Sequence, residues 1–106
     1  MTRVATLDLC ALADAIATGT ISSVAATQAA LDRLDGIGRK LNAVVRLNPA
    51  HALAAAEAAD RKRASGAPLP PLHGVPLAHK DLFYRAGEVS AGGSKIRADF
   101  VPDVTA

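Results

Sequence analysis

The chain has 106 residues, a formal net charge of +2 and a hydrophobic content of 50%, much of it alanine. This length allows one small domain or a piece of a larger one, and the low charge argues against a nucleic-acid partner. The single cysteine, Cys10, excludes an intrachain disulfide or a cysteine metal cluster. Because no segment resembles a secretory leader or a membrane span, we expect a cytoplasmic protein without membrane contact.

Three segments have the apolar spacing of helices, and we expect helices over residues 7–18, 22–40 and 49–64. Ser22 is a suitable N-cap for the second helix, while Gly36 and Gly38 weaken its last turns. The third helix follows Asn48 and Pro49, a capping residue and a proline at the first helical position. Its alanine content makes it the strongest helix prediction in the chain.

Two further segments have the pattern of strands, and we expect strands over residues 43–47 and 75–83. The second follows a proline-rich connector and a turn at Gly74. The order helix, helix, strand, helix, strand is the beginning of an α/β arrangement. Two short strands cannot both cover three helices and pair into a stable sheet, so the pattern indicates that further strands are missing.

Lys80 is the candidate residue for chemistry. In a strand over 75–83, it shares one face with Pro76, Ala78 and Leu82. Burial on such a face would disfavour a charged lysine and favour the proton-accepting amine. A lysine that reaches solvent and pairs with an acid remains the alternative interpretation.

The other polar groups do not form a recognisable site. The histidines lack the spacing of metal ligands, so we expect no metal ion and interpret them as surface or turn residues: His51, His73 and His79. The loop 91–94 contains Gly92 and Gly93 but is not a phosphate-binding loop, and we expect no cofactor.

The segment Leu72-His73-Gly74-Val75-Pro76-Leu77-Ala78-His79-Lys80-Asp81 resembles the lysine-bearing strand of the amidase signature family. Weaker similarity to this family extends over residues 19–23, 41–45, 91–94 and 99–103. The resemblance implies that residues 1–106 are the N-terminal segment of an amidase domain. Its fold would be α/β, with N-terminal helices and the first strands of a mixed sheet that is incomplete as it stands.

The resemblance also implies an activity. Lys80 matches the catalytic base of a Ser-cis-Ser-Lys mechanism that hydrolyses carbon–nitrogen amide bonds, with one serine as nucleophile and a second as proton relay. Asp81 matches a structural position at the strand end. No residue of the chain matches either serine, so we expect the 106-residue chain to be inactive alone.

Several alternatives stay open. Residues 79–87 favour a general amidase over the glutaminase subunit of an aminoacyl-tRNA amidotransferase, and a non-catalytic helical interaction module is a third interpretation. For the complete enzyme the resemblance implies a small-molecule amide substrate, no direct nucleic-acid contact, no membrane and a homodimer. We expect the isolated chain to be poorly stable and to associate, because its apolar strand lacks partners.

Overall fold

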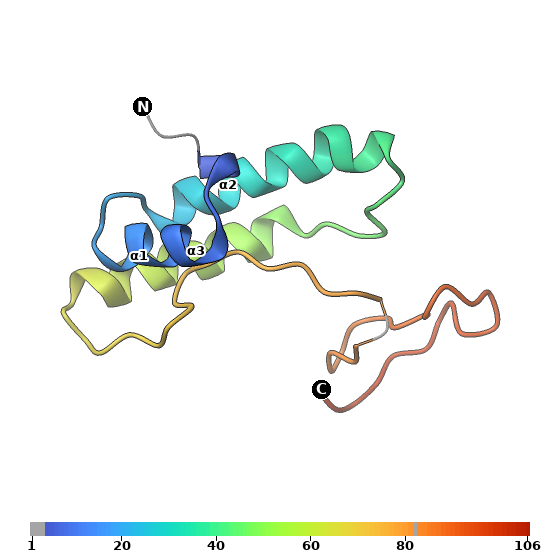
Figure 1. The fold of residues 1–106 in the computed structure, drawn as a ribbon. Helices are drawn as coiled ribbons and strands as arrows, with labels where there is room; N and C mark the ends of the chain where they lie inside the picture. The colour runs from blue at the N-terminus through green and yellow to red at the C-terminus, as the bar shows by residue number, and fades with distance from the viewer. Residues whose placement is uncertain (1–3, 82) are drawn as a thin grey trace. The chain divides into compact units, whose positions relative to one another are not determined.

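The computed structural model describes residues 4–81 and 83–106, and it divides into two compact units. The helical unit is Met1–Pro76, and the C-terminal unit is Leu77–Ala106. The helical unit holds, in chain order, η1 (Val4–Thr6), α1 (Leu9–Ala17), α2 (Ser23–Arg33), η2 (Leu34–Gly38) and α3 (Pro49–Ala64) (Figure 1).

Helix α1 begins where a short polar side chain can satisfy its first backbone donors. Asp8 is the N-cap, and its carboxylate accepts a 2.8 Å hydrogen bond from the N–H of Ala11. The helix ends at Ala17, and Gly19 follows with a φ of +78°. The observed helix thus lies inside the expected range of 7–18.

Helix α2 starts as its cap predicts and changes form after its third turn. The Ser22 hydroxyl accepts a 3.0 Å hydrogen bond from the N–H of Ala25. After Arg33 the backbone widens into the π-helical turn η2, and residues 39–40 are again α-helical, so the helical stretch reaches residue 40 as expected. Glycine lowers helix propensity, and Gly38 also permits close packing: a Cβ there would lie 3.0 Å from Cγ2 of Val44.

Helix α3 occupies Pro49–Ala64, the range expected from its sequence. The Asn48 side chain accepts a 3.2 Å hydrogen bond from the N–H of His51, and Pro49 stands in the first turn. Helices α2 and α3 pack against each other (Figure 1). The core is small because its buried hydrophobic side chains are mostly alanine: Ala13, Ile16, Ala26, Leu31 and Ala56.

The two expected strands are absent from the residues that the structure describes, so the predictions of strands over 43–47 and 75–83 are wrong. Leu82, within the second segment, lies outside the described residues. A strand is stable only when a neighbour pairs with it. Here the N–H of Ala43 bonds back to Gly38, and the N–H of Val75 bonds back to Leu72. The described fold is therefore helical with an irregular C-terminal unit.

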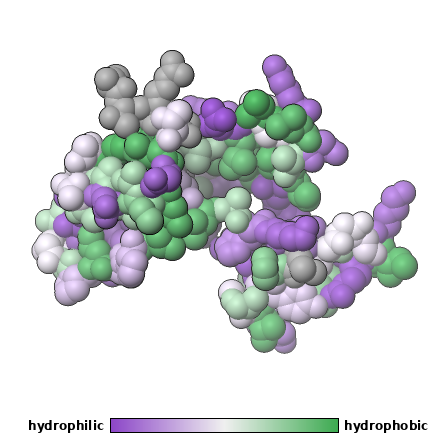
Figure 2. All heavy atoms as spheres, viewed as in Figure 1, coloured by the Kyte–Doolittle hydropathy of each residue, from purple (hydrophilic) through white to green (hydrophobic). Residues whose placement is uncertain are grey.

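The C-terminal unit is built from turns that backbone hydrogen bonds hold together. Gly87 donates to Pro102 over 3.0 Å, and Ser90 donates to Phe100 over 2.9 Å. The rings of Tyr84 and Phe100 lie 5.4 Å apart. Large apolar side chains nevertheless remain exposed on this unit (Figure 2): Leu77, Phe83, Ile96, Phe100, Val101 and Val104.

Candidate active site

A turn at residues 71–74 precedes the candidate lysine and is docked on the helices of its own unit. The Ser23 hydroxyl donates a 2.6 Å hydrogen bond to the carbonyl of Gly74. His73 Nε2 lies 2.9 Å from the carbonyl of Ala59, so Nε2 carries the proton and donates it. Ser23 begins α2 and Ala59 lies in α3. The turn is thus bonded to two different helices.

Gly74 is needed at this turn for two reasons. Its φ is +76°, a left-handed conformation that residues with a Cβ adopt only at a cost. A Cβ added there would lie 3.0 Å from Cγ2 of Ile16 and 3.1 Å from the Ser23 hydroxyl oxygen. Ile16 and Ser23 are each only 1% exposed, so neither side chain has free space to move into.

Asp60 holds the other side of Ser23. One oxygen of its carboxylate accepts a 2.7 Å hydrogen bond from the N–H of Ser23, and the other accepts a 3.1 Å bond from the N–H of Val24. Because the Ser22 cap accepts from Ala25, each backbone donor from Ser23 to Ala25 has a side-chain acceptor. A carboxylate at this end of a helix also complements the helix dipole.

Lys80 lies in the C-terminal unit, and its side chain is exposed. No hydrogen bond or ion pair involves this side chain in the part of the chain that the structure describes. The sequence predicted that Lys80 lies on the apolar face of a strand. The structure does not place it there. The reason is that residues 75–80 are irregular and unpaired, so no sheet defines two faces for them.

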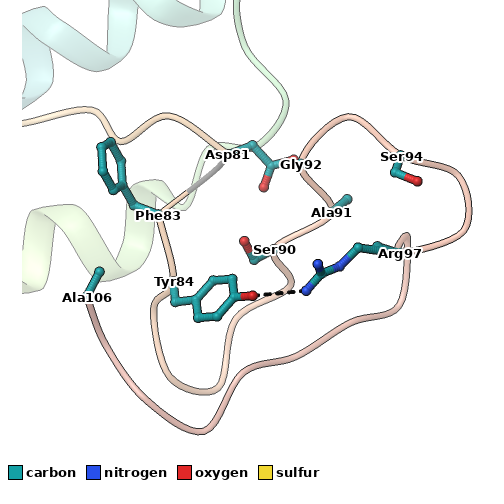
Figure 3. A pocket seen from close by; sticks show the side chains of 9 residues that line it. All are labelled: Asp81, Phe83, Tyr84, Ser90, Ala91, Gly92, Ser94, Arg97 and Ala106. Carbon is teal, nitrogen blue, oxygen red and sulfur yellow. Dashed lines mark hydrogen bonds between the residues drawn. The ribbon is translucent and has the colours of Figure 1, made fainter.

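Asp81, next to Lys80, borders an open hollow of about 440 Å³ in the C-terminal unit (Figure 3). Arg97 Nη2 donates a 3.0 Å hydrogen bond to the hydroxyl of Tyr84, and its Cζ lies 4.3 Å from the centre of the Phe100 ring. The hollow is lined by Asp81, Phe83, Tyr84, Ser90, Ala91, Gly92, Ser94, Arg97 and Ala106. A carboxylate and a guanidinium both line this open surface, which by itself selects no ligand.

The remaining candidates do not converge on a site. His51 and His79 are exposed, whereas His73 belongs to the docked turn. Within residues 4–81 and 83–106, no group of three or more His, Cys, Asp and Glu side chains could hold a metal ion. In the same residues no helix has the length and apolarity needed to cross a bilayer.

Sequence reasoning missed the roles of Ser23 and Asp60. The capping pattern points to Ser22 and gives no reason to single out the serine after it. Asp60 precedes three basic residues near a helix end, where an exposed carboxylate is the ordinary interpretation. Its partners lie 37 and 36 residues earlier, a relationship that only the packing of α2 on α3 reveals.

Comparison with known proteins adds what the geometry leaves open. The family model described as Amidase matches residues 25–106. A glutamyl-tRNA(Gln) amidotransferase subunit from Geobacter sulfurreducens is 47% identical over 96 residues, which cover 91% of this chain and 20% of that protein. The proteins of the same name from Myxococcus xanthus and Chloroflexus aurantiacus are 44% and 40% identical, over 91% and 100% of this chain. The chain thus spans about one fifth of the length of the curated relatives that it matches.

Proposed function

The chain belongs to the amidase family, and we propose that residues 1–106 form the N-terminal segment of an enzyme that hydrolyses carbon–nitrogen amide bonds. The observation that carries this proposal is the family match over residues 25–106, which includes the whole segment from the docked turn to Asp81. The likeness to relatives at 40–47% identity, over nine tenths or more of the chain, supports it.

In this proposal Lys80 is the catalytic base. A neutral lysine amine accepts a proton, through a second serine, from the serine hydroxyl that attacks the amide carbonyl. The same proton then goes to the leaving nitrogen, and water hydrolyses the acyl-enzyme. Neither serine is assigned to a residue of this chain. The serines present, such as Ser90 and Ser94 at the hollow, have no part in the proposed reaction.

Lys80 is exposed in the described structure, whereas an amine base works best where water is excluded and the neutral form is favoured. We therefore propose that, in the complete domain, further segments cover Lys80 and supply the backbone partners that residues 77–81 lack here. The exposed Leu77 and Phe83 on either side of Lys80 support this, because such side chains are normally buried in a finished domain.

A fusion protein tests the proposal. Residues 1–106 would replace the matching N-terminal segment of the Geobacter sulfurreducens relative, and amide hydrolysis would be measured with the unmodified relative as reference. We expect an active fusion that loses activity by several orders of magnitude on Lys80→Ala. A folded fusion without activity, or a folded Lys80→Ala fusion with normal turnover, would contradict the proposed role. The second outcome would support a non-catalytic helical interaction module.

The relatives favour a more specific second candidate. Each of the three reported above is named as one subunit of a glutamyl-tRNA(Gln) amidotransferase, whereas residues 79–87 suggested a general amidase. We propose that the complete protein is such a subunit, with glutamine as its small amide substrate and with other protein subunits as partners. Ammonia release from glutamine that rises when the partner subunits are added would support this candidate. Hydrolysis of simple aryl amides without any response to those subunits would favour a general amidase and leave a homodimer as the alternative assembly.

A further inference from the structure

We propose that Ser23 and Asp60 are positioning residues for Lys80: by holding Gly74 they fix the register of the segment that carries the lysine. This inference rests on the proposed function, because it assumes that Lys80 acts as the base. It goes beyond that function by giving roles to two residues of the helical unit that do not touch the reacting atoms.

Ser23 is itself held by hydrogen bonds on two sides. Its N–H donates to the Asp60 carboxylate over 2.7 Å, and its hydroxyl donates to the Gly74 carbonyl over 2.6 Å. The side chain is 1% exposed, so water does not compete for either bond. A short series of hydrogen bonds therefore runs from α3 through the first residue of α2 to the turn. The Gly74 carbonyl cannot move without breaking it.

The two residues directly after this anchor have no free backbone donor. The N–H of Val75 is used inside the turn, where it donates to Leu72 over 3.2 Å, and Pro76 has no N–H to donate. Leu77 is thus the first residue after Gly74 with a backbone donor available for a sheet. The anchor lies directly before the point at which pairing can begin.

In a strand successive side chains point to opposite faces, so once the segment pairs from Leu77 onward, Lys80 would lie on the face opposite to that of Leu77. A slip of one residue in the pairing would turn the Lys80 amine to the opposite face of the sheet. Among the described residues, 77–81 make no long-range backbone hydrogen bond of their own that would prevent such a slip. The Ser23–Gly74 bond supplies the constraint.

The first test uses the 106-residue chain. Ser23→Ala removes the donor, and Leu31→Ala, about two turns further along α2, is a destabilising control at a buried side chain that makes no hydrogen bond. Hydrogen exchange at the Val75 amide reports whether the turn is still formed. We expect exchange at least about tenfold faster in Ser23→Ala than in Leu31→Ala at equal fractions of unfolded protein. Equal exchange in the two variants would overturn the proposal.

The second test measures turnover in the fusion protein described above. We expect Ser23→Ala to lower kcat about tenfold or more with KM within about twofold, because a misplaced base slows the chemical step without weakening binding. Ser23→Cys, which keeps the shape of the side chain but is slightly larger and a weak donor, should lose most of kcat as well. Leu31→Ala should keep normal kcat per folded molecule.

The outcomes separate this inference from the proposed function. If Lys80→Ala abolishes turnover while Ser23→Ala matches Leu31→Ala in kcat, the base assignment stands and the positioning role is wrong. If Lys80→Ala retains turnover, the proposed function itself fails, and the positioning role fails with it. A parallel loss of kcat in Ser23→Ala and Asp60→Asn, with Leu31→Ala unaffected, supports both residues as positioning residues.

Discussion

The backbone N–H of Ser23 donates a 2.7 Å hydrogen bond to the carboxylate of Asp60, 37 residues later in the chain. This bond joins the first residue of α2 to the last third of α3, and it replaces the water that would otherwise solvate the start of α2. Since alanine supplies much of the apolar core, a bond of this kind matters more here than in a domain with large buried side chains.

Asp60→Asn should destabilise the helical unit. The variant keeps one acceptor oxygen but places an amide against a second backbone donor, and it removes the negative charge from the helix N-terminus. We expect a loss of about 1–3 kcal/mol in the free energy of unfolding. Urea denaturation of the chain, followed by circular dichroism, measures this loss. Glu57→Gln, an exposed charge removal in the same helix, is the control, and equal midpoints for both variants would contradict the assigned role.

Gly74→Ala should cost more stability than Gly66→Ala, although the two glycines have nearly the same backbone conformation. Their φ values are +76° and +78°, but a Cβ at Gly66 meets no atom within 4 Å, whereas one at Gly74 lies 3.0 Å from Ile16. Gly66→Ala therefore measures the conformational cost alone, about 1–2 kcal/mol. Gly74→Ala should add about 1–3 kcal/mol for overpacking. Equal losses would show that the turn moves away from α1 without cost.

The local part of this fold could be predicted from the sequence. Ser22 and Asn48 cap the helices that their positions suggested, because a cap depends only on neighbouring residues. The change of form after Arg33 was harder to predict, since Gly36 and Gly38 indicate a weak helix but not a π-helical turn. These features lie within a few residues of their causes.

The non-local part could not be predicted. The apolar pattern of residues 75–83 describes a segment suited to a strand, but strand formation depends on a partner, and the described residues supply none. The Ser23–Gly74 bond joins residues 51 positions apart, so no local pattern could indicate it. Lys80 and its family resemblance could be read from the residues around it, whereas the anchored turn six residues earlier emerged only from the structure.

The 106-residue chain alone should show no amidase activity. Lys80 is exposed, and its amine forms no hydrogen bond to a serine hydroxyl among the described residues, so it has no nucleophile to activate. Purified chain incubated with aryl amides and esters should give the buffer rate, and the active fusion is the positive control. Turnover above buffer that disappears in Lys80→Ala would show that the chain carries a complete site.

The isolated chain should also self-associate through its C-terminal unit. Ile96 is 96% exposed, Leu77 is 64% exposed and Val104 is 58% exposed, which is unusual for large apolar side chains in a unit of this size. The irregular residues 77–80 add unpaired backbone groups that can recruit another chain. We expect sedimentation velocity to show a mass that rises with concentration.

A pair of double substitutions tests which surface causes this association. Ile96→Ser combined with Val104→Ser should reduce the rise in mass, because it removes two exposed apolar side chains from the C-terminal unit. Ala54→Ser combined with Ala58→Ser, at exposed alanines of α3, should leave the rise unchanged. A chain that stays monomeric at every concentration would show that these apolar side chains are tolerated in water. It would also remove the exposed apolar surface as support for a covering segment over Lys80.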